Sequence, residues 1–103
     1  MTVIEEIAAE RRRQIEAEGL TPEHDDAYPR GELPRAAASY ALAAQWMGDQ
    51  DKRGSPPSFW PWKDALWKPT TRRRDLIKSA ALVIAAIEQL DRAEARKKER
   101  ASQ

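Results

Sequence analysis

The segment from residue 76 to residue 87 constrains the fold of this chain more than any other feature. Its sequence, LIKSAALVIAAI, is apolar nearly all the way round a helical wheel. A helix that is apolar on every side is buried on every side. With 103 residues, the chain is one small domain, and three helices of such a domain can scarcely surround this segment. We therefore expect an all-α fold, a three-helix protomer that assembles into a helical-bundle homo-oligomer through its last helix.

The first helix is expected over about residues 3–19. Thr2 and Glu5 form a capping-box pattern at its start, and Gly19 is typical of the position just past a helix end. Its apolar stripe consists of Ile4, Ile7, Ala8 and Ile15. Three polar side chains interrupt or flank this stripe, namely Arg11, Gln14 and Glu18. Polar groups on a buried stripe need partners, so these three lie either at the rim of the core or in a binding site.

Two further helices are expected along the chain. The second covers about residues 32–48 and is rich in alanine, which lets another helix approach closely. The last begins at about residue 72, capped by Thr70 or Thr71, and runs beyond residue 92. Pro, Gly and polar residues predict loops at 20–31 and 48–58, and a short helical turn is expected around residues 63–66. The expected organisation is a single helical domain at 1–92, with an aromatic and basic linker at 59–71, and a polar C-terminal tail at 93–103.

Composition excludes several classes of function. The chain has no cysteine and one histidine, His24, so it cannot build a Cys-based metal site or a multi-His site by itself. No apolar run is long enough to span a membrane, and acidic residues stand where a signal peptide would carry positive charge. We expect a cytoplasmic protein. A formal net charge of only +1 argues against binding of polymeric nucleic acid.

The segment from residue 59 to residue 74 carries five basic residues, one acid and three tryptophans. Tryptophan faces stack on nucleobases, arginine forks match phosphate groups, and a helix N-terminus adds free N–H groups. This composition indicates a site for a nucleotide or cyclic-nucleotide-type small molecule. The competing interpretation is that the tryptophans plug the end of the bundle and the arginines are solvated. The candidate ligand-binding residues are Trp60, Trp62, Trp67, Lys68, Thr71, Arg72, Arg73 and Arg74, with Arg11 and His24 closing the site.

Four carboxylates form a second candidate site. Asp25, Asp26, Glu32 and Asp75 are oxygen ligands of the kind that Mg²⁺ prefers. The structural alternative is that the Asp pair stabilises a turn while Glu32 and Asp75 favour helix N-termini. These four residues are metal ligands only if the protein is an enzyme; otherwise no cofactor is expected.

The strings ERRRQIEAEGLTPEHDD, GELPRAAASYA and RRRDLIKSAALVIAAIEQLDR resemble small proteins of tailed phages and prophages. More distantly, the chain resembles the MazG-like all-α nucleoside triphosphate pyrophosphohydrolases, a family of oligomeric helical bundles that holds Mg²⁺ through Glu-x-x-Glu and Glu-x-x-Asp motifs. In the matching stretches here, Glu32 and Asp75 are present, and Arg35 and Lys78 replace the second acids. The resemblance implies nucleotide binding in which Arg and Lys neutralise phosphate in place of a metal.

Three functions are therefore weighed. The leading hypothesis is a phage-type nucleotide-binding protein that sequesters a nucleotide-derived immune signal without turnover. The second is a divergent Mg²⁺-dependent nucleotide pyrophosphohydrolase. The third is a protein-interaction module, in which the aromatic residues face a partner protein.

Overall fold

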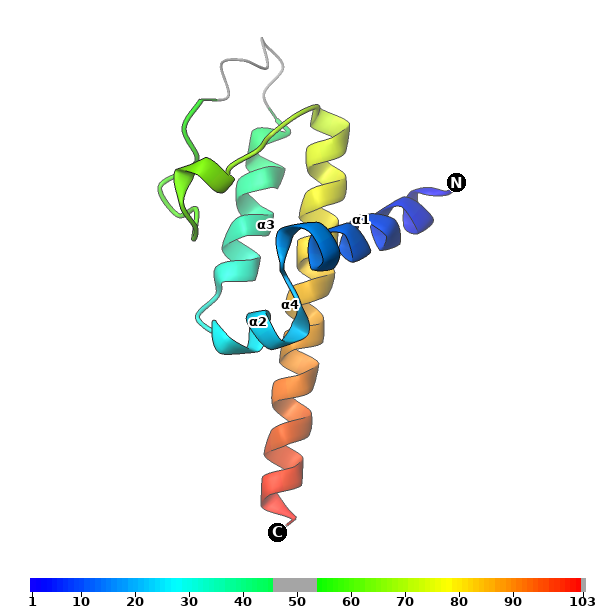
Figure 1. Cartoon of the computed structure of the whole chain (residues 1–103), viewed down its shortest axis with the longest axis vertical. Helices are drawn as coiled ribbons and strands as arrows, with labels where there is room; N and C mark the ends of the chain where they lie inside the picture. The colour runs from blue at the N-terminus through cyan, green and yellow to red at the C-terminus, as the bar shows by residue number, and fades with distance from the viewer. Residues whose placement is uncertain (46–53, 103) are drawn as a thin grey trace.

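The computed structural model describes residues 1–45 and 54–102 (Figure 1). Within these residues the chain forms four α-helices and one 3-10 helix, and no β-strand is present. This confirms the all-α prediction. No helix in this part of the chain is long and apolar enough to cross a membrane. The elements are α1 (Val3–Glu18), α2 (Pro22–Ala27), α3 (Glu32–Ala43), η2 (Asp64–Leu66) and α4 (Arg72–Ala101).

The helix α2 corrects the prediction of a three-helix protomer. A loop was expected at residues 20–31, but the Thr21 hydroxyl accepts a hydrogen bond from the His24 N–H at 3.1 Å. Pro22 follows in the first helical position, where its missing N–H costs nothing. This N-terminal signal is strong enough to start a helix among residues that otherwise favour turns. The helix ends after one and a half turns because Tyr28 leaves the helical conformation directly before Pro29.

The predicted capping residues at the ends of α1 and at the start of α4 are confirmed. Thr2 and Glu5 form the capping box of α1, and Gly19 ends that helix at a φ of +72°, which favours glycine. At the start of α4 the Thr71 hydroxyl accepts from the Arg74 N–H at 3.0 Å. The expected turn near residue 63 is present as η2. The second helix was expected to reach residue 48, which lies outside the described residues, but α3 already ends at Ala43. The helix α4 continues through exposed residues that were expected to form the tail.

The core lies between α3 and α4, which run antiparallel side by side (Figure 1). Small residues of both helices, among them Ala36 and Ala85, are fully buried at this contact and allow close packing. Ser79 donates a hydrogen bond to the Ala37 carbonyl at 2.8 Å, which ties the two helices together. Beyond this core, the C-terminal half of α4 projects away from the rest of the molecule. The core cluster comprises Leu20, Leu33, Ala36, Ala37, Tyr40, Trp60, Leu82, Ala85 and Ala86.

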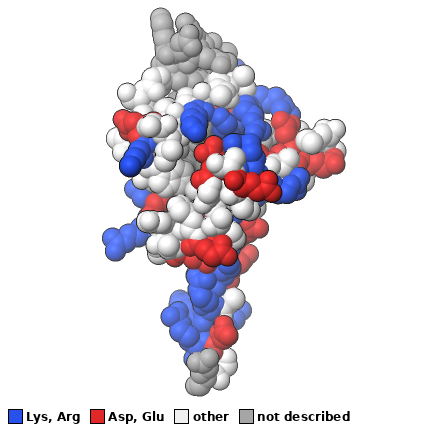
Figure 2. Space-filling model, viewed as in Figure 1, with Lys and Arg blue, Asp and Glu red and all other residues white. Residues whose placement is uncertain are grey.

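The helix α1 packs against α4 through polar side chains, contrary to the apolar stripe expected from its sequence. Its buried residues are Glu10, Arg11 and Gln14, whereas Ile4 is 75% exposed. The reason is that Glu10, Arg11 and the amide nitrogen of Gln14 each find a hydrogen-bond partner. Glu10, for example, receives hydrogen bonds from Arg74 of α4. Figure 2 shows acidic and basic side chains intermixed where α1 crosses α4.

The assignment of Thr71 as the N-cap of α4 can be tested by substitution. Replacing Thr71 with alanine removes the acceptor for the Arg74 N–H, so the free energy of unfolding is expected to fall by about 1 kcal/mol. The matched control is Thr70→Ala. The part of Thr70 that bonds in the fold is its backbone N–H, which reaches the Asp75 carboxylate at 2.9 Å and survives the substitution. Urea unfolding of both variants measures the difference, and equal losses would contradict the cap.

Candidate functional site

A pocket of about 120 Å³ opens between residues 10–24 (the C-terminal half of α1 and the start of α2), α3, the segment around η2, and α4. Four separate stretches of the chain therefore contribute to it. Its lining combines aromatic, apolar and charged side chains. Its volume is below the roughly 300–1,000 Å³ of most ligand pockets, so it can enclose only one part of a ligand. The lining residues are Glu10, Arg13, Gln14, Glu18, Leu20, His24, Tyr40, Trp60, Trp62, Leu66, Lys78 and Leu82.

One wall of the pocket is aromatic. Trp60 packs edge-on against Tyr40, with ring centroids 5.6 Å apart, and Trp62 packs edge-on against Trp60 at 5.3 Å. Trp67 supports this wall by stacking on Tyr40, with centroids 4.8 Å apart. The indole N–H of Trp60 donates to the Lys63 carbonyl at 3.1 Å, which holds its ring in place. The pocket therefore offers a preformed surface against which a planar ring can pack.

The deepest charged group of the pocket is Glu10, whose side chain is completely buried. Arg13 donates to both of its carboxylate oxygens, at 2.8 and 2.9 Å, and Arg74 donates to it as well. Burial by itself would raise the pKa of Glu10, but the hydrogen bonds and charge of Arg13, together with Arg74, bring it below its ordinary value. Glu10 is therefore an ionised carboxylate fully occupied by cations of the protein.

Gln14 presents an unused acceptor beside this carboxylate. Its amide nitrogen donates to Glu10 and to the Lys78 carbonyl, each at 3.3 Å. Because both partners are acceptors, they fix the orientation of the amide. Its carbonyl oxygen Oε1 is buried and has no hydrogen-bond partner within the described part of the protein. A buried acceptor without a donor is costly, so this oxygen is available to accept a hydrogen bond from a molecule in the pocket.

Lys78 brings a buried amine to the same pocket. Its Nζ donates to the Lys68 carbonyl at 2.7 Å and lies 5.3 Å from the centroid of the Tyr40 ring. The Asp75 carboxylate is 3.9 Å away. Burial lowers the pKa of Lys78 below its ordinary value, because the charged ammonium loses water there. The amine is thus held against the aromatic wall by groups of the protein.

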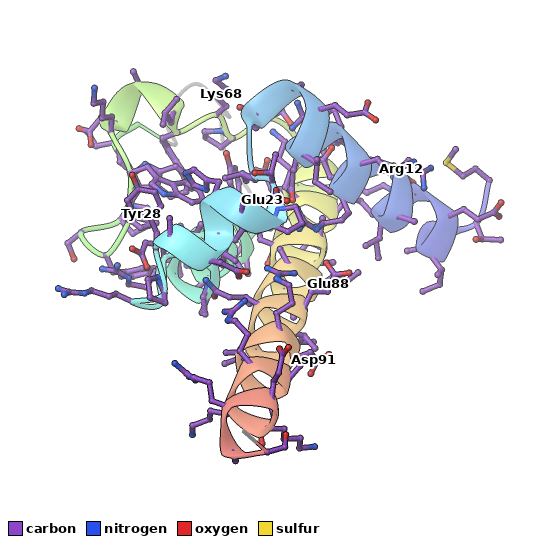
Figure 3. All side chains as sticks on the ribbon, turned by 60° about the horizontal axis from the view of Figure 1, so that its bottom comes forward. Arg12, Glu23, Tyr28, Lys68, Glu88 and Asp91 are labelled. Carbon is purple, nitrogen blue, oxygen red and sulfur yellow. The ribbon has the colours of Figure 1, made fainter. Side chains whose placement is uncertain are left out.

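The structure brings some of the predicted ligand-binding residues together. Trp60, Trp62 and His24 line the pocket. Trp67 lies behind the aromatic wall, and its indole N–H is buried with no hydrogen-bond partner among the described residues. Lys68 extends beside the C-terminal end of α1 (Figure 3), where its Nζ is 3.7 Å from the Glu18 carboxylate.

The remaining predicted residues do not line the pocket themselves. Arg11 donates to the Leu20 carbonyl and pairs with Asp25 and Glu88. The three consecutive arginines point to three different acceptors: Arg72 to the Ala44 carbonyl at 2.8 Å, Arg73 to Glu6, and Arg74 to Glu10. Thr71 caps α4. Arg74 is thus the one arginine of the three that reaches a residue of the pocket.

The four acids considered as metal ligands lie in different surroundings. Asp25 is buried against Arg11 and His24, whereas Asp26 pairs with Arg92 and Arg96. Glu32 accepts from the Arg30 N–H at the start of α3, and Asp75 from the Thr70 N–H. In residues 1–45 and 54–102, no group of three or more His, Asp or Glu side chains is placed to hold a metal ion.

Sequence reasoning missed several pocket residues. Gln14 and Glu18 carried a signal, since polar residues beside an apolar stripe need partners, and both line the pocket. Tyr40 stood out as one of few large side chains on an alanine-rich helix. Glu10 and Arg13 carried no such signal, because their importance comes from the contact between α1 and α4.

No family model, curated protein or solved structure matches this chain. The geometry of the pocket is therefore the basis for its proposed function.

Proposed function

We propose that this protein binds a nucleotide, with the base in the pocket against the Tyr40, Trp60 and Trp62 wall. The observation that carries the proposal is the buried, unpartnered Gln14 Oε1 beside that wall. Nucleobases have a flat ring, which can stack on the aromatic wall, and N–H groups on the ring edge, which can donate to Gln14 Oε1. The sugar and phosphate would extend toward the mouth of the pocket.

Basic side chains support this orientation. Arg13 and the exposed Lys68 both lie at the Glu18 end of the pocket, where each pairs with that carboxylate. Either cation can shift from Glu18 to a phosphate oxygen, because these surface pairs are weak. We therefore place the phosphate near Lys68 and Arg13. Arg74 does not line the pocket but pairs with Glu10, which does.

Binding without turnover is the form of the proposal that the acids favour. Glu10 is held by Arg13 and Arg74, and Glu18 by Arg13 and Lys68. Both carboxylates are thus paired with cations of the protein, which compete with a metal ion for their oxygens. Sequestration of a nucleotide-derived immune signal in a phage-infected cell is the biological role that we propose for such reversible capture.

The test is a calorimetric titration of the full chain with nucleosides, nucleotides and cyclic dinucleotides in the presence of Mg²⁺, followed by heat denaturation and analysis of the released ligand. Recovery of unchanged ligand supports sequestration. Release of a monophosphate and pyrophosphate would show the hydrolase instead. Absence of binding to every compound of the panel would overturn the proposal and favour the protein-interaction module.

The aromatic wall gives a sharper prediction for any nucleotide that binds. Replacing Trp62 with alanine is expected to weaken its affinity by about 5- to 150-fold, the loss of one base-stacking contact of about 1–3 kcal/mol. Phe59→Ala is the matched control, since Phe59 is an exposed aromatic residue of the same segment and does not line the pocket. Equal affinities of the Trp62→Ala variant and the unaltered protein would place the base elsewhere.

A further inference from the structure

An apolar stripe runs along the outer face of α4, well separated from the pocket. Its members are Leu76, Ala80, Val83, Ile87 and Leu90, which follow one another at intervals of four, three, four and three residues. Leu76, Val83, Ile87 and Leu90 are 52%, 45%, 53% and 68% exposed. This alternation of four and three is the spacing that brings apolar residues to one seam between two paired helices.

Nothing in the described part of the chain covers this stripe. At 100° per residue, its centre lies about a third of a turn round α4 from Leu82, which faces the core. The helix α1 meets α4 on the other side, through Arg74 and Lys78. A row of exposed, large apolar side chains on one face of a helix marks an interaction surface.

The charges at the two ends of the stripe identify the occupant. Arg73 and Asp91 stand nine residues before and nine residues after position 82. The eighteen residues between them are five full helical turns, so both flank the stripe on the same side. Asp91 has no ion-pair partner in residues 1–45 and 54–102 and is exposed (Figure 3). The helix α2 contacts this part of α4 through Gln89 and Arg92, which lie on the other side of the helix. Arg73 donates to Glu6 of α1, but its side chain is still 64% exposed and can reach a second carboxylate. The flank of the stripe therefore carries an exposed cation near one end and a carboxylate without an ion-pair partner near the other.

We propose that a second copy of this chain covers the stripe, with the two α4 helices antiparallel about a two-fold axis near residues 82 and 83. In this arrangement Arg73 of each copy lies opposite Asp91 of the other, and Leu76 packs near Ile87. A parallel pair would instead set Arg73 against Arg73 and bring together the basic ends of α4, where Lys97, Lys98 and Arg100 follow one another closely. Like charges in direct opposition are destabilising, and a two-fold interface needs only one self-complementary patch.

The stripe itself is tested by sedimentation of the full chain at about 50 µM. We expect the mass of a dimer for the unaltered protein. The Val83→Glu variant should raise the dimer dissociation constant by about thirtyfold or more, as a hot-spot substitution does. The Ile4→Glu variant is the control, because Ile4 is an exposed apolar residue on α1, and it should remain dimeric. A monomeric unaltered protein, or a Val83→Glu variant that stays dimeric with unchanged helical circular dichroism, would overturn the proposal.

The orientation is tested by disulfide trapping, which is clean here because the chain has no cysteine. A Leu76→Cys protein mixed with an Ile87→Cys protein should form a mixed disulfide dimer under mild oxidation. The Leu90→Cys protein by itself should form no disulfide dimer, because its two sulfurs lie at opposite ends of an antiparallel pair. Efficient trapping of Leu90→Cys with itself would show a parallel pair and contradict the proposal. Neither test depends on nucleotide binding.

Discussion

Replacing Arg11 with methionine is expected to lower the free energy of unfolding by about 3–5 kcal/mol at pH 7. The Arg11 side chain is buried and donates to the Leu20 carbonyl at 3.1 Å. It also lies 3.5 Å from the completely buried carboxylate of Asp25. Methionine fills a similar volume, so the loss comes from a buried carboxylate left without its cation and a carbonyl left without its donor. Urea unfolding measures the change.

Two further variants separate this charge effect from simple loss of packing. Arg11→Met combined with Asp25→Asn removes both charges, and it is expected to be more stable than Arg11→Met by about 1 kcal/mol or more. Arg12→Met, on the exposed side of α1 (Figure 3), should change stability by less than about 0.5 kcal/mol. A double variant no more stable than Arg11→Met would show that packing, and not the buried charge, dominates.

The stability of the Arg11→Met variant should also depend on pH. Burial raises the pKa of Asp25, and the hydrogen bond from His24 and the charge of Arg11 oppose this rise. Loss of Arg11 raises the pKa further. A carboxyl group whose folded pKa is raised destabilises the fold where it is ionised, and this penalty disappears as the group becomes protonated. The stability deficit of Arg11→Met relative to the unaltered protein should therefore be smaller at pH 4 than at pH 7.

Replacing Glu10 with glutamine is expected to cost about 2 kcal/mol at pH 7, since the ionised carboxylate accepts charge-assisted hydrogen bonds from Arg13 and Arg74. The pKa of Glu10 lies below its ordinary value of 4.5. Its stabilising effect is therefore complete above the unfolded pKa and is lost as the pH falls through the folded one. The difference in free energy of unfolding between the unaltered protein and the Glu10→Gln variant should be constant above about pH 5.5 and become smaller below about pH 4.5.

The exposed Glu16 of the same helix provides the control for this second substitution. Glu16→Gln should alter the free energy of unfolding by less than about 0.5 kcal/mol at either pH. Urea unfolding of the three proteins at pH 4 and pH 7 measures both effects. A Glu10→Gln deficit that is as large at pH 4 as at pH 7 would show that the carboxylate acts through shape and not through its charge.

Local signals in the sequence determined where the described helices begin and end. Thr2, Gly19 and Thr71 mark three of these ends, and each acts through hydrogen bonds or backbone angles within a single turn. The apolar character of residues 76–87 likewise predicted the central helix. The residue types of Trp60, Trp62 and His24 were sufficient to nominate them for the site, because aromatic and imidazole side chains are few in this chain.

Only the tertiary structure decided which face of α1 is buried and what the pocket contains. Periodicity favoured the isoleucines of α1, but Glu6 and Glu10 meet Arg73 and Arg74, which are 67 and 64 residues away in the chain. Such partners cannot be assigned from spacing along one helix, and they make burial of the polar face possible. The unused Gln14 carbonyl and the enclosed Lys78 amine follow from the same packing of α1 on α4, because burial, unlike residue type, is a property of the assembled fold.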